Sequence, residues 1–359
     1  MRESQDNKEA AVTHRPLVSV LIPCWGCKDY IAEAIQSALS QTYEPLEVVV
    51  VEDCGGDGTY EEVLKIKDSR LRVYRNEQNL GQHLNKNRSL ELARGELIKY
   101  LDGDDVLESN CVSVLVDGWE KAGEGVGVVF GQFTIIDSDG SLIARPRRWG
   151  VSGRCSGIKV LDVVSLKKSA GCMFGNPSPH LIKREALESI GGFPKNQSWS
   201  GDLETFWKLL SVCDVVFISD SVARYRMQPG SVGHTRKVML GVEDNINMVD
   251  DLTSFFGQKK GLPVHLSDTA FIQESKVWQS GSMIMPEYLA RLRRKNNQFA
   301  EICNVFRRHG LEKELLRFAR KKLVPYLWGT LVSKCRVFLG LPRHPNLFTR
   351  KEARYVQSQ

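Results

Sequence analysis

The 359-residue sequence predicts an α/β fold whose sheet is mostly parallel. Residues 17–23 and 46–51 are short, nearly continuous apolar runs, which is typical of strands buried on both faces of a parallel sheet. Each run is followed by a segment with apolar residues at helical spacing, so strands and helices alternate along the chain. Such alternation favours parallel strands joined by right-handed crossovers, with helices on both faces of the sheet.

The first predicted strand runs from Leu17 to Pro23, and the proline ends it. Asp29 is the expected N-cap of the next helix, which continues to about Leu39. The second predicted strand, 46–51, ends in an acidic turn with three glycines. Glycine tolerates positive φ and lets the backbone approach a ligand closely, so this turn predicts a nucleotide site. It is not a P-loop, because the Gly-Lys-Ser/Thr ending is absent.

A third strand at 71–74 and a helix at 83–93 lead to a fourth strand at 96–101. The fourth strand ends in Asp102-Gly103-Asp104-Asp105, at the sheet edge where open α/β folds bind ligands. Three neighbouring carboxylates are unfavourable unless a cation compensates them or water separates them. An Asp-x-Asp pair suits Mg²⁺ or Mn²⁺ held together with substrate phosphates. The alternative is a solvated acidic turn that caps the next helix.

Several short motifs in a fixed order resemble the family two glycosyltransferases. The resemblance covers roughly residues 16 to 235 and implies the inverting GT-A fold, with a nucleotide-diphosphate sugar as donor and Mn²⁺ or Mg²⁺ as cofactor. It implies one domain at 16–236, with a nucleotide-sugar half at 16–105 and an acceptor half at 106–236. The motifs are Val18–Pro23, Ser40–Tyr43, Glu52–Thr59, Asn79–Gly81, Ala93–Glu96 and Leu101–Asp105.

The resemblance also implies roles for residues at the donor site. Pro23 would end the strand whose following loop flanks the base, and Asp53 would hydrogen-bond that base, usually uracil. Lys86 stands where the family often has arginine, and it would neutralise phosphate as a point charge. The loop after Pro23 departs from the family, because Trp25-Gly26 replaces the usual aromatic-Asn pair.

The same resemblance implies the metal and catalytic residues. Asp102 and Asp104 would form the metal-binding pair, with Asp104 in direct contact, while Asp105 would support them or cap a helix. Asp202 matches the family's helix-opening Glu-Asp motif and would be the general base that inversion requires. Two alternatives remain for this region: Asp202 stabilises a helix N-terminus through the helix dipole, or Glu204 is the base. His180 is expected in a strand, and His234 or Arg236 in a loop that could contact the diphosphate.

The composition limits the cellular setting. The nine cysteines are odd in number and scattered, and no apolar signal segment is visible, so we expect reduced thiols and a cytoplasmic protein. Cys24-Trp-Gly-Cys27 has metal or redox spacing without a second pair, which favours coincidence. Residues 1–15 are expected to be a disordered lead-in. No run of eighteen apolar residues exists, which argues against a membrane-spanning helix.

Residues 237–359 are predicted to form a mostly helical, basic extension. Its last part, 313–359, contains eleven Lys or Arg against two Glu. Residues 323–341 are apolar, aromatic and flanked by cations, which suits a helix lying on an anionic membrane at the inner face. The alternative is a helix packed on the catalytic domain with a solvated basic face. Residues 237–312 would carry acceptor or homodimer contacts, and no nucleic-acid-binding motif accompanies the charge.

Three functional classes fit these patterns. The first is a metal-dependent, hexosyltransferase-like enzyme that transfers a sugar to a glycan or lipid-linked acceptor, as in surface polysaccharide synthesis. The second is a non-catalytic, sugar-nucleotide-binding paralogue that acts in assembly. The third is a nucleotidyltransferase, which usually begins with a glycine-rich, Arg- and Lys-containing loop that residues 23–28 do not resemble. The intact carboxylates favour the enzyme, because a binding protein need not keep a base.

Overall fold

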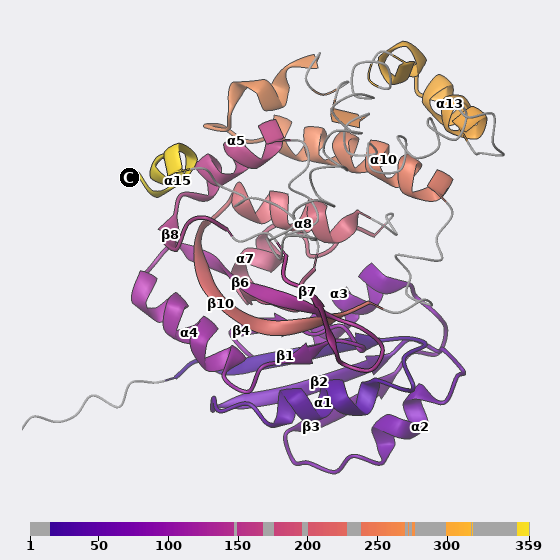
Figure 1. The fold of residues 1–359 in the computed structure, drawn as a ribbon, viewed down its shortest axis with the longest axis vertical. Helices are drawn as coiled ribbons and strands as arrows, with labels where there is room; N and C mark the ends of the chain where they lie inside the picture. Colours follow the sequence, from indigo (N-terminus) through magenta and orange to yellow (C-terminus); the bar gives the residue numbers. More distant parts are fainter. Residues whose placement is uncertain are drawn as a thin grey trace, which may run out of the picture.

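The computed structural model describes most of the chain around one central sheet (Figure 1). The described residues are 15–146, 149–167, 176–195, 200–227, 238–269, 272, 275–276, 299–316, 318 and 350–358. The strands are β1 (Val18–Cys24), β2 (Leu46–Glu52), β3 (Leu71–Arg75), β4 (Leu97–Tyr100), β5 (Val106–Leu107), β6 (Val126–Ile136), β7 (Leu142–Ala144), β8 (Gly153–Cys155), β9 (His180–Lys183) and β10 (Asp214–Arg226).

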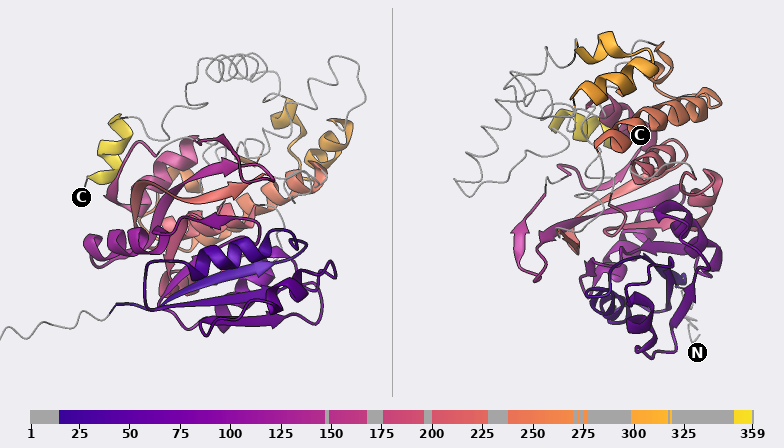
Figure 2. Two further views of the ribbon diagram at one scale, coloured as in Figure 1. Left: turned by 60° about the horizontal axis from the view of Figure 1, so that its bottom comes forward. Right: turned by 90° about the vertical axis from the view of Figure 1, so that its right-hand side faces the viewer.

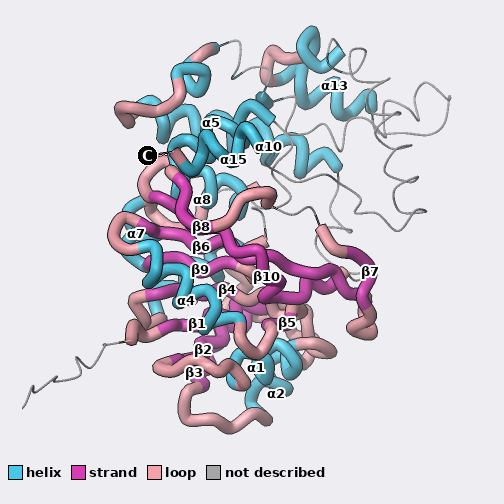
Figure 3. The backbone as a smooth tube through the Cα atoms, turned by 60° about the vertical axis from the view of Figure 1, so that its left-hand side comes forward, coloured by secondary structure: helices cyan, strands magenta, loops and turns pink. Residues whose placement is uncertain are grey.

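The strand order is β3-β2-β1-β4-β9-β6-β10-β5, with β7 beside β6 and β8 beside β10 (Figure 3). β1 pairs in parallel with both β2 and β4, and β2 pairs in parallel with β3. The four strands predicted from apolar runs are therefore confirmed, each within one residue at either end. The other half of the sheet is mixed, because β9 enters antiparallel between β4 and β6, while β6 and β10 are parallel.

Helices cover both faces of the sheet, which makes it the middle layer of three. One buried apolar cluster contains side chains of α1 (Ile31–Leu39), α2 (Thr59–Leu64) and α4 (Cys111–Ala122). The cluster on the other face contains side chains of α3 (Gln82–Leu92), α5 (Gly157–Lys167), α7 (Arg184–Ser189) and α8 (Gly201–Leu210). The expected α/β class is confirmed.

The expected N-cap of α1 is wrong. The helix follows Tyr30, and no side chain caps it. The carbonyl oxygen of Cys27 instead accepts hydrogen bonds from the N–H groups of Tyr30 and Ile31, at 3.0 and 2.9 Å. A backbone turn therefore satisfies the donors that the Asp29 side chain was expected to satisfy.

The described part of the extension is helical and packs against the half of the domain that follows Asp105. It comprises α10 (Val238–Gly257), the 3₁₀ helix η1 (Val264–Ser267), α13 (Phe299–Arg308) and α15 (Arg350–Gln357). α10 packs against α8, and α15 lies against α5 and β8 (Figures 1 and 2). Among the described residues no helix is both long and apolar enough to cross a membrane. The expected lead-in before Arg15, the boundary at 236 and the apolar tail at 323–341 lie outside the described residues.

Candidate active site

The loop after β4 holds its three carboxylates in different environments. Asp102 and Asp104 are partly exposed, whereas Asp105 is fully buried. The Asp105 carboxylate accepts hydrogen bonds from Ser178 Oγ at 2.6 Å and from Arg226 N at 2.9 Å. Burial, and then the charges of Asp104 and Asp102, raise the pKa of Asp105 well above its usual value. Asp105 therefore braces the loop from inside and caps no helix, and the two partly exposed carboxylates of the loop are Asp102 and Asp104.

Close packing also fixes the loop on its other side. A Cβ atom on Gly103 would lie 2.7 Å from Cys27 Sγ, so only glycine fits between the two carboxylates without a shift. The buried guanidinium of Arg226 donates to the carbonyl oxygen of Asp104 at 2.9 Å and to Glu33 at 2.6 Å. It also donates to two carbonyl groups in the turn between β6 and β7. These contacts hold the backbone of the loop independently of what the carboxylates of Asp102 and Asp104 bind.

A buried lysine connects this loop to α8. Lys86 Nζ lies 2.6 Å from Asp202 Oδ1 and 3.9 Å from Asp102 Oδ1, and the lysine side chain is 1% exposed. Burial alone would lower the pKa of Lys86, but the charges of Asp202 and Asp102 outweigh it and raise that pKa. Burial raises the pKa of Asp102, and Lys86 opposes this shift. The structure thus brings two predicted site residues, Asp102 and Asp202, together around the ammonium group of a third, Lys86.

Asp202 lies in the first turn of α8, as the sequence predicts. Its Oδ2 accepts a long hydrogen bond of 3.4 Å from Gln82 Nε2, and His83 Nδ1 is 3.9 Å from Oδ1. The alternative base, Glu204, is fully buried and pairs with Lys208 at 2.5 Å. Residues two apart on a helix point in different directions, so Glu204 does not share the side of α8 that faces Lys86. Of the two carboxylates, Asp202 is therefore the one that lies beside Lys86.

Asp53 organises the loop that precedes α3. It follows β2, where its N–H donates to the carbonyl oxygen of Cys24 at 2.9 Å. Its carboxylate accepts hydrogen bonds from Asn76 Nδ2 at 2.7 Å and from the N–H groups of Leu80 and Gly81 at 2.8 Å. A carboxylate offers about four acceptor positions, so three internal donors leave capacity for one more. Asp53, which is 2% exposed, is therefore largely committed to holding this loop, with one acceptor position left over.

Pro23 lies in β1, buried and paired in register with Val51 of β2. The loop that follows exposes the ring of Trp25, which is 54% accessible. A Cβ atom on Gly55 would lie 3.2 Å from Trp25 Cδ1, so the two predicted base-site loops touch. The ends of β1 and β2 thus form one continuous surface.

The residues of the β4 loop fit a divalent cation. Within the described ranges, no group of three or more His, Cys, Asp or Glu side chains is placed to hold a metal by itself. Asp102 and Asp104 do offer carboxylate oxygens on a braced loop. Mg²⁺ characteristically takes one or two carboxylates and completes its shell with substrate phosphates and water. This donor set therefore suits an ion that is bound together with a diphosphate.

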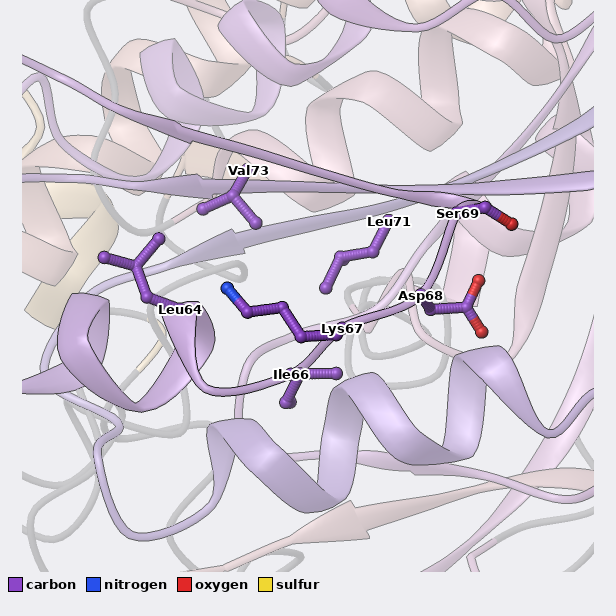
Figure 4. Close-up of a pocket in the computed structure, with 7 residues that line it drawn as sticks. All are labelled: Leu64, Ile66, Lys67, Asp68, Ser69, Leu71 and Val73. Carbon is purple, nitrogen blue, oxygen red and sulfur yellow. The ribbon is translucent and has the colours of Figure 1, made fainter.

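A separate hollow of about 610 Å³ lies between α2 and the edge strand β3 (Figure 4). None of its lining residues is a predicted site residue, and it sits where the sheet ends at β3. It is lined by Leu64, Ile66, Lys67, Asp68, Ser69, Leu71 and Val73. We do not assign the donor site to it.

Residues 19–191 match the sequence model of glycosyl transferase family 2. This segment is a glycosyl transferase family 2 domain. The matched segment is accordingly a glycosyltransferase domain of the kind that uses a nucleotide-sugar donor. It is 26% identical over 253 residues to glycosyltransferase GlyG of Streptococcus pneumoniae serotype 4, covering 68% of this chain and 79% of GlyG. It is 40% identical over 89 residues to an Escherichia coli enzyme, WfaP, covering 25% of this chain and 36% of WfaP. Several other curated relatives, such as E. coli chondroitin synthase, are likewise spanned over only about a third of their length.

Solved structures show the same fold. Staphylococcus aureus TarS 1-349 in complex with UDP-GlcNAc superposes with a TM-score of 0.62 at 17% identity, over 90% of this chain and 92% of TarS 1-349. A mannosyltransferase from Pyrobaculum calidifontis, in complex with GDP-Man and Mn²⁺, gives a TM-score of 0.53 at 20% identity, over 87% and 88% of the two chains. At these identities the similarity establishes the GT-A-like fold.

Sequence reasoning missed the residues that support the site. Ser178, Arg226, Gln82 and His83 touch the predicted carboxylates from other elements. No local pattern marks them, since each acts on a residue more than seventy positions away. His180 lies in β9 and is buried against the ring of Phe130, with centroids 4.8 Å apart, as expected of a strand residue. His234 and Arg236 lie outside the described residues.

Proposed function

We propose that this enzyme transfers a sugar from a UDP-sugar to a hydroxyl group of a glycan or lipid-linked acceptor, with inversion at the anomeric carbon. One observation carries the proposal: the Asp102–Asp104 loop and Asp202 converge on the ammonium group of Lys86. Displacement of a diphosphate requires carboxylates that hold the donor and its metal, and a separate carboxylate that acts as a base. In this chain the loop of the first group and the second carboxylate both reach the ammonium group of Lys86. The intact carboxylate on α8 supports catalysis over a role restricted to binding.

The names of similar proteins support the substrate classes. WfaP is named as a UDP-Glc:alpha-D-GlcNAc-diphosphoundecaprenol beta-1,3-glucosyltransferase, and TarS is described with UDP-GlcNAc. The Pyrobaculum enzyme is described with GDP-Man, so base identity needs a direct test.

The donor end is assigned to four side chains. Asp53 would accept an imide N–H of the base through its remaining acceptor position. Asp102 and Asp104 would hold Mn²⁺ or Mg²⁺, which neutralises charge on the departing diphosphate when bound. Lys86 would contribute a second positive charge beside them, as a point charge that tolerates several phosphate orientations.

The acceptor end is assigned to Asp202. Its carboxylate takes the proton of the acceptor hydroxyl as the oxygen forms a bond to the anomeric carbon. The bond from that carbon to the diphosphate breaks on the opposite face, and the nucleoside diphosphate leaves with the electron pair. Atoms and charge balance without any further reactant.

A donor screen tests this proposal. The protein is incubated with UDP-, GDP- and dTDP-sugars in Mn²⁺, with and without a chelator, and nucleotide release is measured with simple glycoside acceptors and by slow hydrolysis. We expect release from a UDP-sugar that stops on chelation, and an inverted anomer by NMR. Calorimetric binding of UDP-sugar without any turnover would favour the non-catalytic paralogue, and a retained anomer would exclude inversion.

A further inference from the structure

One continuous segment of the chain contacts both ends of the proposed site. The N–H groups of Leu80 and Gly81 bind the carboxylate of Asp53, as described above. The next residues begin α3, and its first two turns present three side chains to Asp202. These are Gln82, at 3.4 Å, His83, at 3.9 Å, and Lys86, at 2.6 Å. The residues that contact the proposed base therefore follow directly, along the chain, after the residues that bind Asp53.

His83 has a tightly defined place in this arrangement. Its side chain is 2% exposed, and its ring stacks on Phe193 with planes 3° apart and centroids separated by 6.0 Å. Phe193 is itself fixed, because Asn87 bonds both its N–H and its carbonyl oxygen, at 2.8 and 2.9 Å. The imidazole cannot move far without breaking this stack.

The start of α8 is shaped to receive that ring. A Cβ atom on Gly201 would lie 2.4 Å from His83 Nε2 and 2.6 Å from its Cδ2 atom, closer than real side chains approach. The imidazole thus fills the space that a side chain at position 201 would need. The residue at this position, immediately before Asp202, is glycine.

We infer that His83 is a positioning residue for Asp202, and that Gly201 is glycine because His83 occupies its side-chain space. The inference rests on the proposed role of Asp202 as the base. The ring forms one wall beside the carboxylate, while Lys86 and Gln82 hold its two oxygens. A reacting carboxylate needs such locked neighbours, because a displacement of about 1 Å costs on the order of 10²-fold in rate.

Four variants test this: Gly201→Ala, His83→Ala, the double variant, and the matched control Gly257→Ala. Gly257 ends α10, and a Cβ atom there meets nothing within 4 Å. We expect Gly201→Ala to lower kcat by about 10- to 100-fold, with the donor KM and calorimetric UDP affinity within about twofold of wild type. His83→Ala should lower kcat as well. The double variant should fall no further than His83→Ala, because the atoms that clash are gone.

Several outcomes would overturn the inference. One is an unchanged kcat in His83→Ala; another is a double variant whose loss is the sum of the two single losses. A fall in UDP affinity that parallels kcat would assign His83 to the donor site or to folding. If the wild-type protein turned over no donor at all, the proposed function itself would be excluded. Asp202 would then not be a base, and His83 would have no base to position. The control Gly257→Ala should match wild type in all measurements.

Discussion

At the scale of single residues, a variant of Asp202 can separate an effect on the chemical step from an effect on donor binding. We predict that Asp202→Asn lowers turnover by on the order of 10² to 10⁴, the usual contribution of a positioned general base. The amide keeps the size of the side chain and an oxygen that can accept from Lys86, so affinity for a UDP-sugar should stay close to that of wild type. Steady-state kinetics and calorimetry measure the two quantities. A parallel loss of donor affinity would make Asp202 structural, and near-normal turnover would place the base elsewhere.

Asp104 offers a second test at this scale. We predict that donor binding requires Mn²⁺ or Mg²⁺ and that Asp104→Ala weakens it, because the variant loses one of the two proposed metal-binding carboxylates while Arg226 still holds the backbone of the loop. Calorimetry with a UDP-sugar, with and without Mn²⁺, gives the affinities. Circular dichroism checks that the variant keeps the wild-type fold; its contact with Arg226 is retained, because that contact uses the carbonyl oxygen of residue 104. Equal affinity under chelation, or in the variant, would exclude the metal role.

At the scale of elements, Glu47 ties the parallel half of the sheet together. This buried residue of β2 accepts from Ser19 Oγ in β1 and from Arg94 N, both at 2.6 Å, and from Arg72 in β3 at 2.9 Å. Burial alone would raise the pKa of Glu47, but these donors outweigh it and lower that pKa. A lowered folded-state pKa gives stability that is present above the unfolded pKa and is lost as the pH falls through the folded value.

We therefore predict that Glu47→Gln reduces the free energy of unfolding by about 1–3 kcal/mol at pH 7, the usual cost of leaving buried donors poorly paired. The difference from wild type should shrink as the pH falls below about 4.3, the ordinary pKa of a glutamate in the unfolded chain, and on through the lowered folded-state pKa of Glu47. Urea unfolding at a series of pH values measures this difference. A gap between the two proteins that stays constant with pH would show that the charge of Glu47 does not contribute.

The same scale shows which features the sequence encodes locally. β1 and β2 were predictable because each buries a short apolar run, and α1 because its buried apolar residues recur with helical spacing. Asp102 and Asp104 could also be found, since they follow directly after β4. By contrast, Arg226 and His83 contact residues more than a hundred positions away along the chain. Such contacts depend on how the strands are arranged in the sheet. That arrangement changes from parallel to mixed where β9 enters antiparallel between β4 and β6.

At the scale of the whole molecule, the extension is joined to the catalytic half by specific contacts. Ser200, which precedes α8, donates to Asn245 of α10 at 2.5 Å, and both side chains are buried. At the end of the chain, the carbonyl oxygen of Val356 accepts from Ser156 N at 2.9 Å, and the Val356 side chain is fully buried. Phe318, before the apolar tail, is also buried. The described residues on either side of the stretch 319–349 are thus held on the protein.

This arrangement sharpens the membrane hypothesis for the tail. We predict that the full-length protein floats with anionic vesicles but not with neutral ones, and that high salt reduces flotation, because each cation near an anionic surface contributes about 1 kcal/mol. Reversing Arg320, Lys321 and Lys322 to Glu should abolish flotation while leaving turnover on a soluble acceptor unchanged. A control that reverses the exposed Lys65 and Arg88 changes charge elsewhere and should still float. Charge reversal is preferable to truncation, which would also remove α15 and expose its buried contacts. Failure to float at every salt concentration would favour the alternative, in which the tail packs on the catalytic domain and its basic face meets only solvent.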